Sequence, residues 1–185
     1  NQEKRYIGGV CLNEGCIPTK TLLHSAKILD YCRHGEVYGV ACEHPVLRHE
    51  AVLARKDKVV KKLVAGVNAG LKKHHVDVKL DTGVIAGMSA EEILVSAGGE
   101  THAGKRLVIS TGSQPVIPPV PGLKEAMEAG FALTSSGMLR LKELPARLVV
   151  IGGGVIGLEM AAYFTAAGSQ VTIVELLPKI AGAMD

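Results

Sequence analysis

The 185-residue sequence predicts an α/β fold, on three observations. Helical periodicity dominates the first half of the chain, short β-like segments follow, and a strand, glycine turn, helix and strand stand near the end. The last unit is typical of a Rossmann-like, doubly wound domain, in which helices join parallel strands. With 47% hydrophobic residues, the chain is long enough for about one to two domains with real cores.

Composition excludes several classes of partner. The sequence has 21 basic and 18 acidic residues, and a net charge of +3 spread along the chain does not favour nucleic acid. No run approaches the roughly 20 apolar residues of a membrane span. The first residues are polar and are not expected to form a secretion signal. We therefore expect a globular protein with no membrane or nucleic-acid partner.

Two helices are predicted in the first half. The first runs from Ile17 to about Arg33 and opens with Pro18, which suits a first helical turn because its missing N–H would be unpaired there. The second runs from about Glu50 to His75. Its apolar residues recur at three- and four-residue steps, with lysines on the other side, so one side should be exposed. These apolar residues are Val60, Leu63, Val64, Val67 and Leu71.

Short β-like segments and a proline-rich linker follow. The predicted strands of a small sheet span residues 76–80, 83–87, 93–96 and 106–110. Residues 113–122 hold four prolines in ten positions and cannot continue a helix or a central strand. We therefore place a domain boundary here, with a first domain over 1–113, a linker and domain entry over 114–146, and the start of a second domain over 147–185.

The second domain opens with a predicted βαβ unit. A buried strand over 147–151 leads into Gly152, Gly154 and Gly157, then a helix from Val155 to Ala167 and a strand over 170–175. The helix should end at Gly168.

Its G-x-G-x-x-G turn predicts a dinucleotide site. Such glycines permit a tight turn and close approach of a pyrophosphate, and the helix N-terminus offers unpaired N–H groups to it. Glu175, 23 positions after Gly152, can accept from a ribose 2′-OH and would repel a 2′-phosphate, which favours NAD over NADP. The alternative is a glycine turn that only packs a helix on a strand.

Four cysteines, at positions 11, 16, 32 and 42, lack the Cys-x-x-Cys spacing of a zinc site and favour a reducing compartment. Cys16 directly precedes a helix, where partial positive charge lowers a thiolate pKa, so it is predicted to be the reactive member of a redox pair with Cys11. The alternative is two small buried thiols without chemistry. Cys32 and Cys42 are predicted to be inert packing residues, and the seven histidines to be surface or core residues rather than metal ligands.

The segment from Gly8 to Lys20 closely resembles the redox-disulfide motif of the pyridine nucleotide-disulfide oxidoreductases. The similarity continues through Gly152–Glu159 and runs the length of the chain. It implies a partial Rossmann-like FAD domain followed by the beginning of a Rossmann-like NAD domain. Within the family, the members that oxidise dihydrolipoamide with NAD are the most similar.

The resemblance assigns roles to individual residues. Cys11 would be the thiol that exchanges with substrate, and Cys16 the thiolate against the flavin. Lys20 would lie near the flavin, paired with Glu159 across the domains. Further FAD contacts would come from Glu3, Gly8, Gly9, Val10, Gly83, Thr111, Gly112 and Ser113, and NAD contacts from Gly152, Gly154, Val155, Ile156, Gly157 and Glu175.

The resemblance also implies that essential parts of such an enzyme fall outside residues 1–185. These are the first FAD-binding turn and a dimer domain with a His–Glu base, so the chain by itself is expected not to turn over. The implied partners of the full enzyme are a lipoyl-bearing subunit of a 2-oxoacid dehydrogenase or glycine-cleavage complex and a second copy. The expected location is the cytoplasm, or the mitochondrial matrix in a eukaryote.

Two alternatives remain open. Glutathione-type and mercuric reductases share the cysteine spacing but use NADPH, which Glu175 disfavours. A non-catalytic dinucleotide-binding module would have no physical reason to keep Lys20 and Glu159 as a paired buried charge beside two active thiols.

Overall fold

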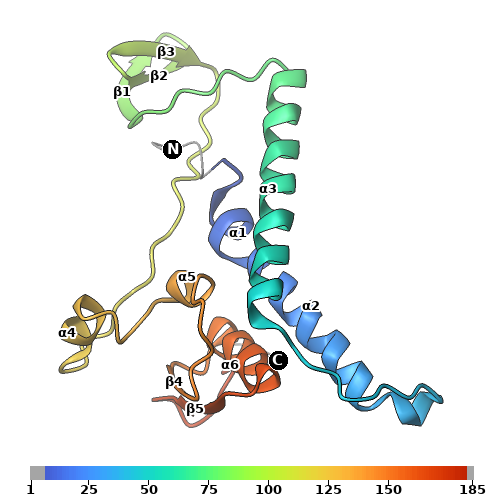
Figure 1. The fold of residues 1–185 in the computed structure, drawn as a ribbon. Coiled ribbons are helices and arrows are strands. Elements are labelled where there is room, and N and C mark those ends of the chain that lie inside the picture. Colours follow the sequence, from blue (N-terminus) through green and yellow to red (C-terminus); the bar gives the residue numbers. More distant parts are fainter. Residues whose placement is uncertain (1–6, 183–185) are drawn as a thin grey trace.

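The structure is a computed structural model that describes residues 7–182. Figure 1 shows a long helix, α3, with a small sheet at one end and a helix–strand cluster at the other. The helices are α1 (Gly9–Glu14), α2 (Cys16–Arg33), α3 (His49–Lys73), α4 (Leu123–Glu128), α5 (Ser135–Met138) and α6 (Val155–Ala167), with a 3₁₀ turn, η2 (Gly35–Tyr38). The strands are β1 (Val84–Ser89), β2 (Glu92–Ala97), β3 (Glu100–Gly104), β4 (Arg147–Ile151) and β5 (Gln170–Val174).

Helix α2 confirms the first predicted helix within one residue at its start. It follows α1 with only Gly15 between them, and a Cβ at Gly15 would lie 3.1 Å from the Cα of Cys11. Such a contact is tighter than side chains normally allow, so the absence of a side chain permits the two helices to meet this closely. Pro18 lies buried in the first turn of α2.

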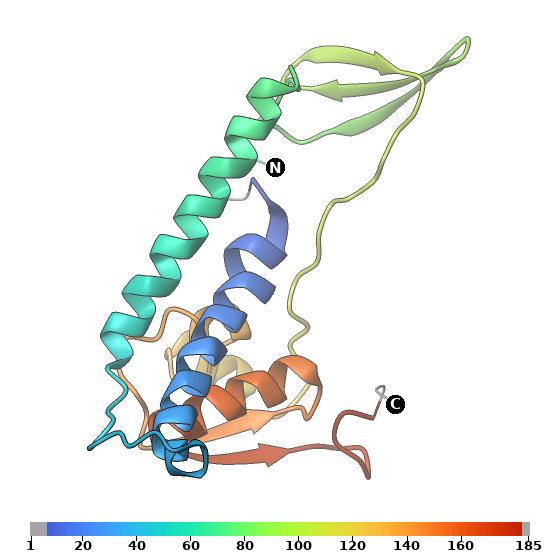
Figure 2. The same cartoon turned by 90° about the vertical axis from the view of Figure 1, so that its right-hand side faces the viewer.

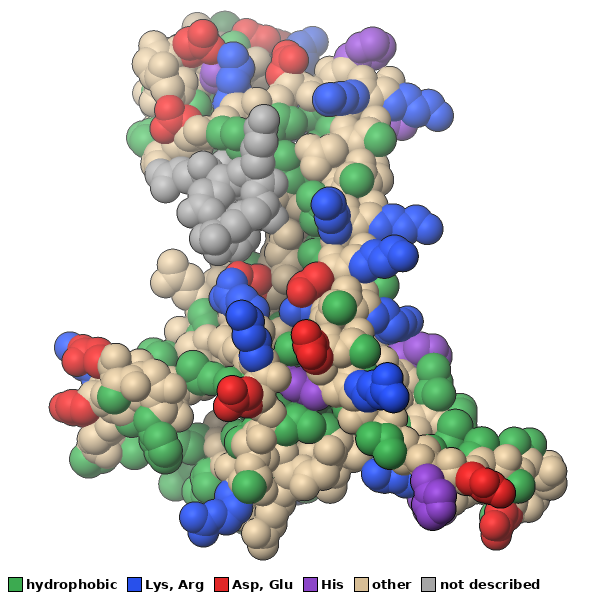
Figure 3. Space-filling view, viewed as in Figure 1, with side chains coloured by type: hydrophobic (Ala, Val, Ile, Leu, Met, Phe, Trp, Pro, Cys, Tyr) green, Lys and Arg blue, Asp and Glu red, His purple; other side chains and the backbone are tan. Residues whose placement is uncertain are grey.

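Helix α3 confirms the second predicted helix, and lysine and arginine side chains are spaced along its exposed side (Figure 3). Its first turns are buried through His49, Val52, Leu53 and Lys56. The predicted apolar stripe beyond them is only partly covered, since Leu63 is 41% and Val67 38% exposed.

The antiparallel sheet β1–β2–β3 corrects the predicted strands. Segments 83–87 and 93–96 are strands, shifted by one or two residues, but residues 76–80 and 106–110 form none. Both have β-type composition, yet a strand also needs a partner that completes its hydrogen bonds.

The third strand, β3, was not predicted because it carries almost no large apolar residue. Its signal is the dipeptide Gly98–Gly99, a two-residue hairpin turn with φ angles of 59° and 79° between the paired Ala97 and Glu100.

Residues 106–120 form neither helix nor strand, as the prolines predict for 113–120, and run back along the molecule from the sheet toward α4 (Figure 1). The division into domains at 113/114 and 146/147 stays a prediction.

The elements of the βαβ unit are as predicted to within one residue, but β4 is not the buried strand expected, since Val149 is 62% and Ile151 53% exposed. Strands β4 and β5 pair in parallel, with Arg147 opposite Gln170 and Ile151 opposite Val174. Helix α6 ends at Gly168 in the left-handed conformation, with φ of 114°.

The core joins this unit to α2 and α3. Leu22 and Ala26 of α2 and Val52 and Leu53 of α3 form one cluster with Leu139 and with Met160, Tyr163 and Phe164 of α6. Tyr163 and Phe164 are fully buried and meet edge to face, with ring centroids 5.3 Å apart.

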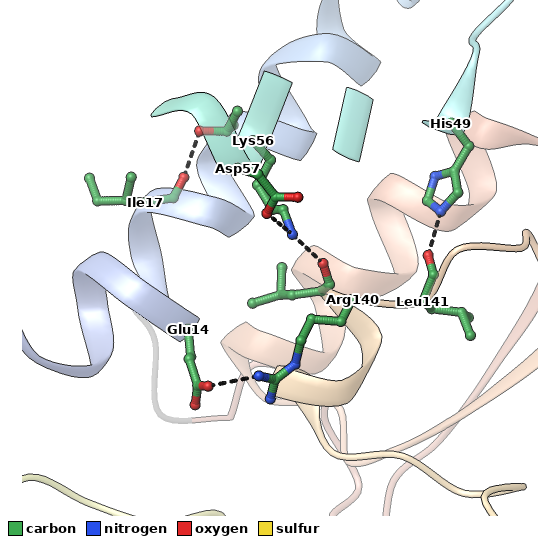
Figure 4. A network of polar contacts seen from close by, with 9 residues as sticks. Glu14, Ile17, His49, Lys56, Asp57, Arg140 and Leu141 are labelled. Atoms are coloured by element: carbon green, nitrogen blue, oxygen red, sulfur yellow. Dashed lines mark hydrogen bonds and ion pairs between the residues drawn. The ribbon is translucent and has the colours of Figure 1, made fainter. Parts of the chain in front are cut away.

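Two buried polar side chains at the edge of this core, His49 and Lys56, are paired (Figure 4). Nε2 of His49 lies 2.8 Å from the Leu141 carbonyl, which can only accept, so Nε2 donates and Nδ1 accepts from the Tyr163 hydroxyl at 2.7 Å. Burial raises the pKa of Tyr163 to about 12, so the hydroxyl keeps its proton. Lys56 donates to the Leu139 carbonyl at 2.8 Å and pairs with Asp57.

Within residues 7–182, no helix combines the length and apolarity needed to cross a membrane.

Candidate active site

The predicted redox pair lies at the junction of α1 and α2. Cys11 stands in α1 and Cys16 is the first residue of α2, and both are free and exposed thiols. This exposure excludes the alternative of two buried thiols. Because only Gly15 separates the two helices, both thiols of the predicted redox pair lie at one junction.

The predicted lowering of the Cys16 pKa is wrong for this dithiol. The hydrogen bond with Cys11, followed by partial burial and the Cys11 charge, raises the pKa of Cys16. A backbone hydrogen bond and the Lys20 charge act in the opposite direction but do not outweigh the neighbouring thiol. Helix position alone could not predict this, since the partner sulfur comes from a different helix.

Lys20 and Glu159 form an ion pair between α2 and α6. Lys20 lies one helical turn after Cys16, on the same side of α2. The pair is not buried as predicted, because the Lys20 side chain is 61% and the Glu159 side chain 22% exposed. A non-catalytic module could therefore keep this ion pair without the cost of burying charge. The pair does not argue against that alternative.

Each glycine of the second predicted site has a distinct structural role. Gly152 adopts a φ of 104°, which disfavours side chains. A Cβ at Gly157 would lie 2.1 Å from the Gly152 carbonyl oxygen, so this position must be glycine for α6 to approach β4. A Cβ at Gly154 would meet nothing within 4 Å, and Gly154 caps α6 without a side-chain hydrogen bond. The first turn of α6, whose N–H groups have no partner within the helix, therefore begins beside open space. A bound anion requires such an arrangement.

Glu175 closes the same site from the end of β5. Its Oε2 accepts from the Gly153 N–H at 2.6 Å, and its Oε1 accepts from the Leu177 N–H at 2.8 Å. These backbone hydrogen bonds lower the pKa of Glu175. The carboxylate is therefore ionised at neutral pH beside the glycine turn.

Two supports of this turn were not predicted. A Cβ at Gly153 would lie 2.8 Å from the Cγ2 atom of Ile180, and Gly153 accepts from the Ala181 N–H at 2.8 Å. The middle glycine of Gly152–Gly153–Gly154 thus lets the segment after β5 pack on the turn. Three consecutive glycines were the only sequence signal for it.

The remaining predicted residues stand on several segments. Val155 and Ile156 are exposed in the first turn of α6, Val10 is exposed in α1, and Gly8 and Gly9 precede it with left-handed backbones. Gly83 leads into β1, and exposed Thr111, Gly112 and Ser113 lie in the extended segment after β3. Glu3 lies outside the described residues. The cofactor roles of all these residues stay predictions.

Side chains around α1 that were not predicted hold the cysteine helix in place. Asn13 donates to the Gly9 carbonyl at 2.8 Å, and Glu14 pairs with Arg140 at 3.2 Å (Figure 4).

The residues present fit the two cofactors that the sequence implies. The space at Gly154, with Glu175 beside it, suits a dinucleotide pyrophosphate and its ribose. At the other site, the exposed Cys11 and Cys16 and the exposed Lys20 side chain leave the α1–α2 junction accessible to a flat, electron-accepting ring.

Comparison with known proteins agrees with this arrangement. The family model described as pyridine nucleotide-disulphide oxidoreductase matches residues 3–185. Dihydrolipoyl dehydrogenases of Acholeplasma laidlawii and Mycoplasma pneumoniae are 45% and 43% identical over 99% of the chain. The chain spans only 54% and 39% of their respective lengths.

The chain is also similar to solved structures of a flavoprotein disulfide reductase. The Cu(II) complex of the HOCl-induced flavoprotein disulfide reductase RclA from Escherichia coli is similar over the whole chain, with a TM-score of 0.77 and 32% identity, and the chain covers 37% of it. The family match, the thiol pair and the glycine turn lead to one conclusion: this chain belongs to the pyridine nucleotide-disulphide oxidoreductase family.

Proposed function

We propose that the full-length protein containing this chain oxidises dihydrolipoamide to lipoamide, with NAD as the final acceptor, through the Cys11–Cys16 pair and FAD. The placement of two free, exposed thiols, Cys11 and Cys16, at the α1–α2 junction carries the proposal. The names of the relatives add the substrate, since those of Acholeplasma laidlawii and Mycoplasma pneumoniae are dihydrolipoyl dehydrogenases.

The chemistry of the pair is thiol–disulfide exchange. One thiolate of dihydrolipoamide attacks the Cys11 sulfur of the oxidised pair, which breaks the Cys11–Cys16 bond and releases Cys16 as a thiolate. The second substrate thiolate attacks the substrate sulfur of the mixed disulfide and releases Cys11. The substrate thus loses two electrons and two protons, and the pair gains the electrons as two reduced sulfurs.

The surrounding residues prepare the pair for this exchange. The Lys20 ammonium favours the Cys16 thiolate, and its ion pair with Glu159 holds it at the domain contact. Gly8, Gly9, Val10, Gly83 and residues 111–113 would hold FAD, while the glycine turn and Glu175 would hold NAD. When bound, FAD accepts the electron pair from the dithiol and NAD removes it as a hydride.

The same reading proposes the partners. A lipoyl-bearing subunit of a 2-oxoacid dehydrogenase or glycine-cleavage complex would present the dithiol, and a second copy would complete the enzyme. The proposed location is a reducing compartment, the cytoplasm or the mitochondrial matrix, in which the four thiols would stay reduced.

The test is the visible absorbance of the full-length protein, titrated without oxygen with dihydrolipoamide and then with NADH and NADPH. We expect a flavin spectrum, a long-wavelength thiolate–flavin charge-transfer band on two-electron reduction, and a clear preference for NADH. Cys16→Ser should abolish the band. Cys42→Ser, at an exposed thiol outside the proposed site, should keep it.

Three outcomes would overturn the proposal in different ways. A protein without flavin, or a band that survives Cys16→Ser, removes the redox mechanism and favours a non-catalytic dinucleotide-binding module. A flavoprotein that prefers NADPH and reduces glutathione disulfide or mercuric ion is another member of the family. A flavoprotein that shows the band with NADH but not with dihydrolipoamide has a different dithiol substrate.

A further inference from the structure

One ion pair joins the end of α1 to the segment that follows α5. Glu14 is the last residue of α1 and its only charged residue, and its Oε1 lies 3.2 Å from Nη1 of Arg140 (Figure 4). The Glu14 side chain is 23% and the Arg140 side chain 59% exposed, so the guanidinium reaches a partly covered carboxylate from the surface. The pair thus ties the redox junction to a distant part of the chain.

The Arg140 end of this contact is firmly held. Leu139, directly before Arg140, is 3% exposed and belongs to the core cluster, and its carbonyl accepts from buried Lys56 of α3 at 2.8 Å. The Arg140 N–H donates to the Gly137 carbonyl at 3.0 Å, which extends the turn at the end of α5. Arg140 therefore extends from a backbone that core packing and hydrogen bonds hold in place.

The Glu14 end lies at a pivot between the two cysteines. Gly15, the single residue between α1 and α2, has a φ of −134° and a ψ of −114°, outside the helical range. The direction of α1, and with it the position of Cys11 relative to Cys16, therefore depends on what else α1 contacts. Leu12 is the only residue of α1 that is buried, and its apolar packing is not directional. The ion pair adds a fixed point at the end of the helix.

A cavity of about 200 Å³ lies beside the ion pair, and Glu14, Arg140 and Lys56 all line it. In the described part of the chain, open space rather than packed side chains therefore flanks the pair on this side. Packing there cannot replace the restraint, because atoms across an open gap make no van der Waals contact. Loss of the ion pair should accordingly free the end of α1.

We propose that Arg140 is a positioning residue for the redox pair: through Glu14 it fixes the end of α1 and so keeps the Cys11 sulfur within reach of the Cys16 sulfur. This inference rests on the proposed function, from which it takes Cys11 and Cys16 as the redox pair. Arg140 acts through the direction of a helix and takes no part in the exchange itself. Two thiols held in a fixed arrangement close a disulfide more readily, because their effective concentration is higher.

The test measures how readily this disulfide forms in the full-length protein. The protein is equilibrated without oxygen at set ratios of oxidised to reduced glutathione, alkylated, and digested with trypsin without reductant. The protein dithiol loses two electrons and two protons, and glutathione disulfide becomes two molecules of glutathione. Cys11 and Cys16 share the tryptic peptide 6–20, between Arg5 and Lys20, so its mass distinguishes the alkylated dithiol from the disulfide. The ratio at half oxidation reports the redox potential of the pair, which a loss of overall stability does not change.

The other two cysteines do not interfere. Trypsin places Cys32 in peptide 28–33 and Cys42 in peptide 34–48, both separate from peptide 6–20. Cys42 is exposed and Cys32 partly exposed, so the prediction that they are packing residues is wrong.

Three substitutions at position 140 grade the ion pair. Arg140→Lys keeps the positive charge and should leave the half-oxidation ratio near that of the original protein. Arg140→Gln removes the charge and should require a ratio about two- to fivefold more oxidising, the range expected for an ion pair that is partly exposed. Arg140→Glu places two carboxylates side by side and should require a more oxidising ratio still.

Substitutions at the partner and at a remote ion pair complete the set. Glu14→Gln should match Arg140→Gln, and the double variant should equal either single one, because all three remove the same contact. Glu100→Gln is the matched control. It removes another exposed ion pair, with Lys79 at the β1–β2–β3 sheet, and should leave the ratio unchanged.

The proposal is overturned if Arg140→Gln and Glu14→Gln keep the original ratio, or if Glu100→Gln shifts it equally. A shift in Arg140→Lys as large as in Arg140→Gln would also overturn it, since the charge would then not matter. The readout needs no flavin, NAD or dihydrolipoamide, so these failures leave the proposed function standing. A peptide 6–20 that is fully alkylated at every ratio in the original protein would instead remove the redox pair, and both proposals with it.

Discussion

At the scale of single residues, substitutions at Gly157 and Gly154 of the dinucleotide turn distinguish the packing of α6 on β4 from the binding of a dinucleotide. Gly157→Ala would place a Cβ 2.1 Å from the Gly152 carbonyl oxygen, so α6 must move away from β4. We expect a loss of about 1–3 kcal/mol in the free energy of unfolding, as for other overpacked sites. Chemical denaturation of the full-length protein measures this loss, and a fluorescence titration with NADH should show weaker binding.

Gly154→Ala is the matched control. Its Cβ meets no atom within 4 Å, so the loss should stay near about 0.5 kcal/mol, the cost of alanine at a helix N-cap. NADH binding should nevertheless weaken, because the methyl group occupies the space left for a pyrophosphate. Equal destabilisation by both variants would show that this space is not open.

His49 and Tyr163 form the second residue-scale prediction. His49→Leu leaves the Tyr163 hydroxyl and the Leu141 carbonyl without their partner in a buried place, and we expect a loss of about 1–3 kcal/mol. Tyr163→Phe should cost less, and the double variant less than the sum of the two. Denaturation curves for the four proteins give the coupling. Strict additivity would contradict the hydrogen bond.

At the scale of elements, the start of α2 makes a prediction about Cys16. Cys11→Ala removes the largest cause that raises the pKa of Cys16, so the pKa should fall. Lys20→Met removes a positive charge that favours the thiolate, so the pKa should rise. The rate of Cys16 alkylation in the reduced full-length protein, followed against pH, should move to lower pH in the first variant and to higher pH in the second.

Lys20→Arg keeps the charge and is the control for that experiment. Its profile should match the original protein, since arginine stays protonated and can still meet Glu159. If Lys20→Arg shifted the pH profile of Cys16 alkylation as far as Lys20→Met does, the packing of the Lys20 side chain, and not its charge, would set the pKa of Cys16.

The elements also show where sequence reasoning reached its limit. The βαβ unit was predicted to within a residue, because its strand, glycine turn and helix signals are all local. Residues 76–80 and 106–110 were not, because pairing depends on a distant segment. The raised pKa of Cys16 was missed for the same reason, since it depends on a thiol that a different helix brings near.

At the scale of the whole molecule, one core holds both predicted sites. Helix α2 carries Cys16 and Lys20, and α6 carries Glu159 and follows the glycine turn. Both helices contribute to one buried cluster, which includes Leu22 and Tyr163. The three-stranded sheet stands at the far end of α3 and shares none of these core residues (Figure 2). The alignment of the Lys20–Glu159 pair therefore depends on the packing at the α2–α6 contact.

This division predicts that a cavity in the core loosens the sites and spares the sheet. Leu22 is 1% exposed, so Leu22→Ala should cost about 2–5 kcal/mol, whereas Ile28→Ala, on the same helix but 50% exposed, should cost about 1 kcal/mol or less. Hydrogen exchange of the full-length protein shows which elements lose stability. In Leu22→Ala, amides of α2 and α6 should exchange faster and those of β1–β3 should not, because local opening follows the contacts that are weakened. Equal acceleration in the sheet would mean that the two ends open together, and the core at the α2–α6 contact would then stabilise the whole chain rather than the sites alone.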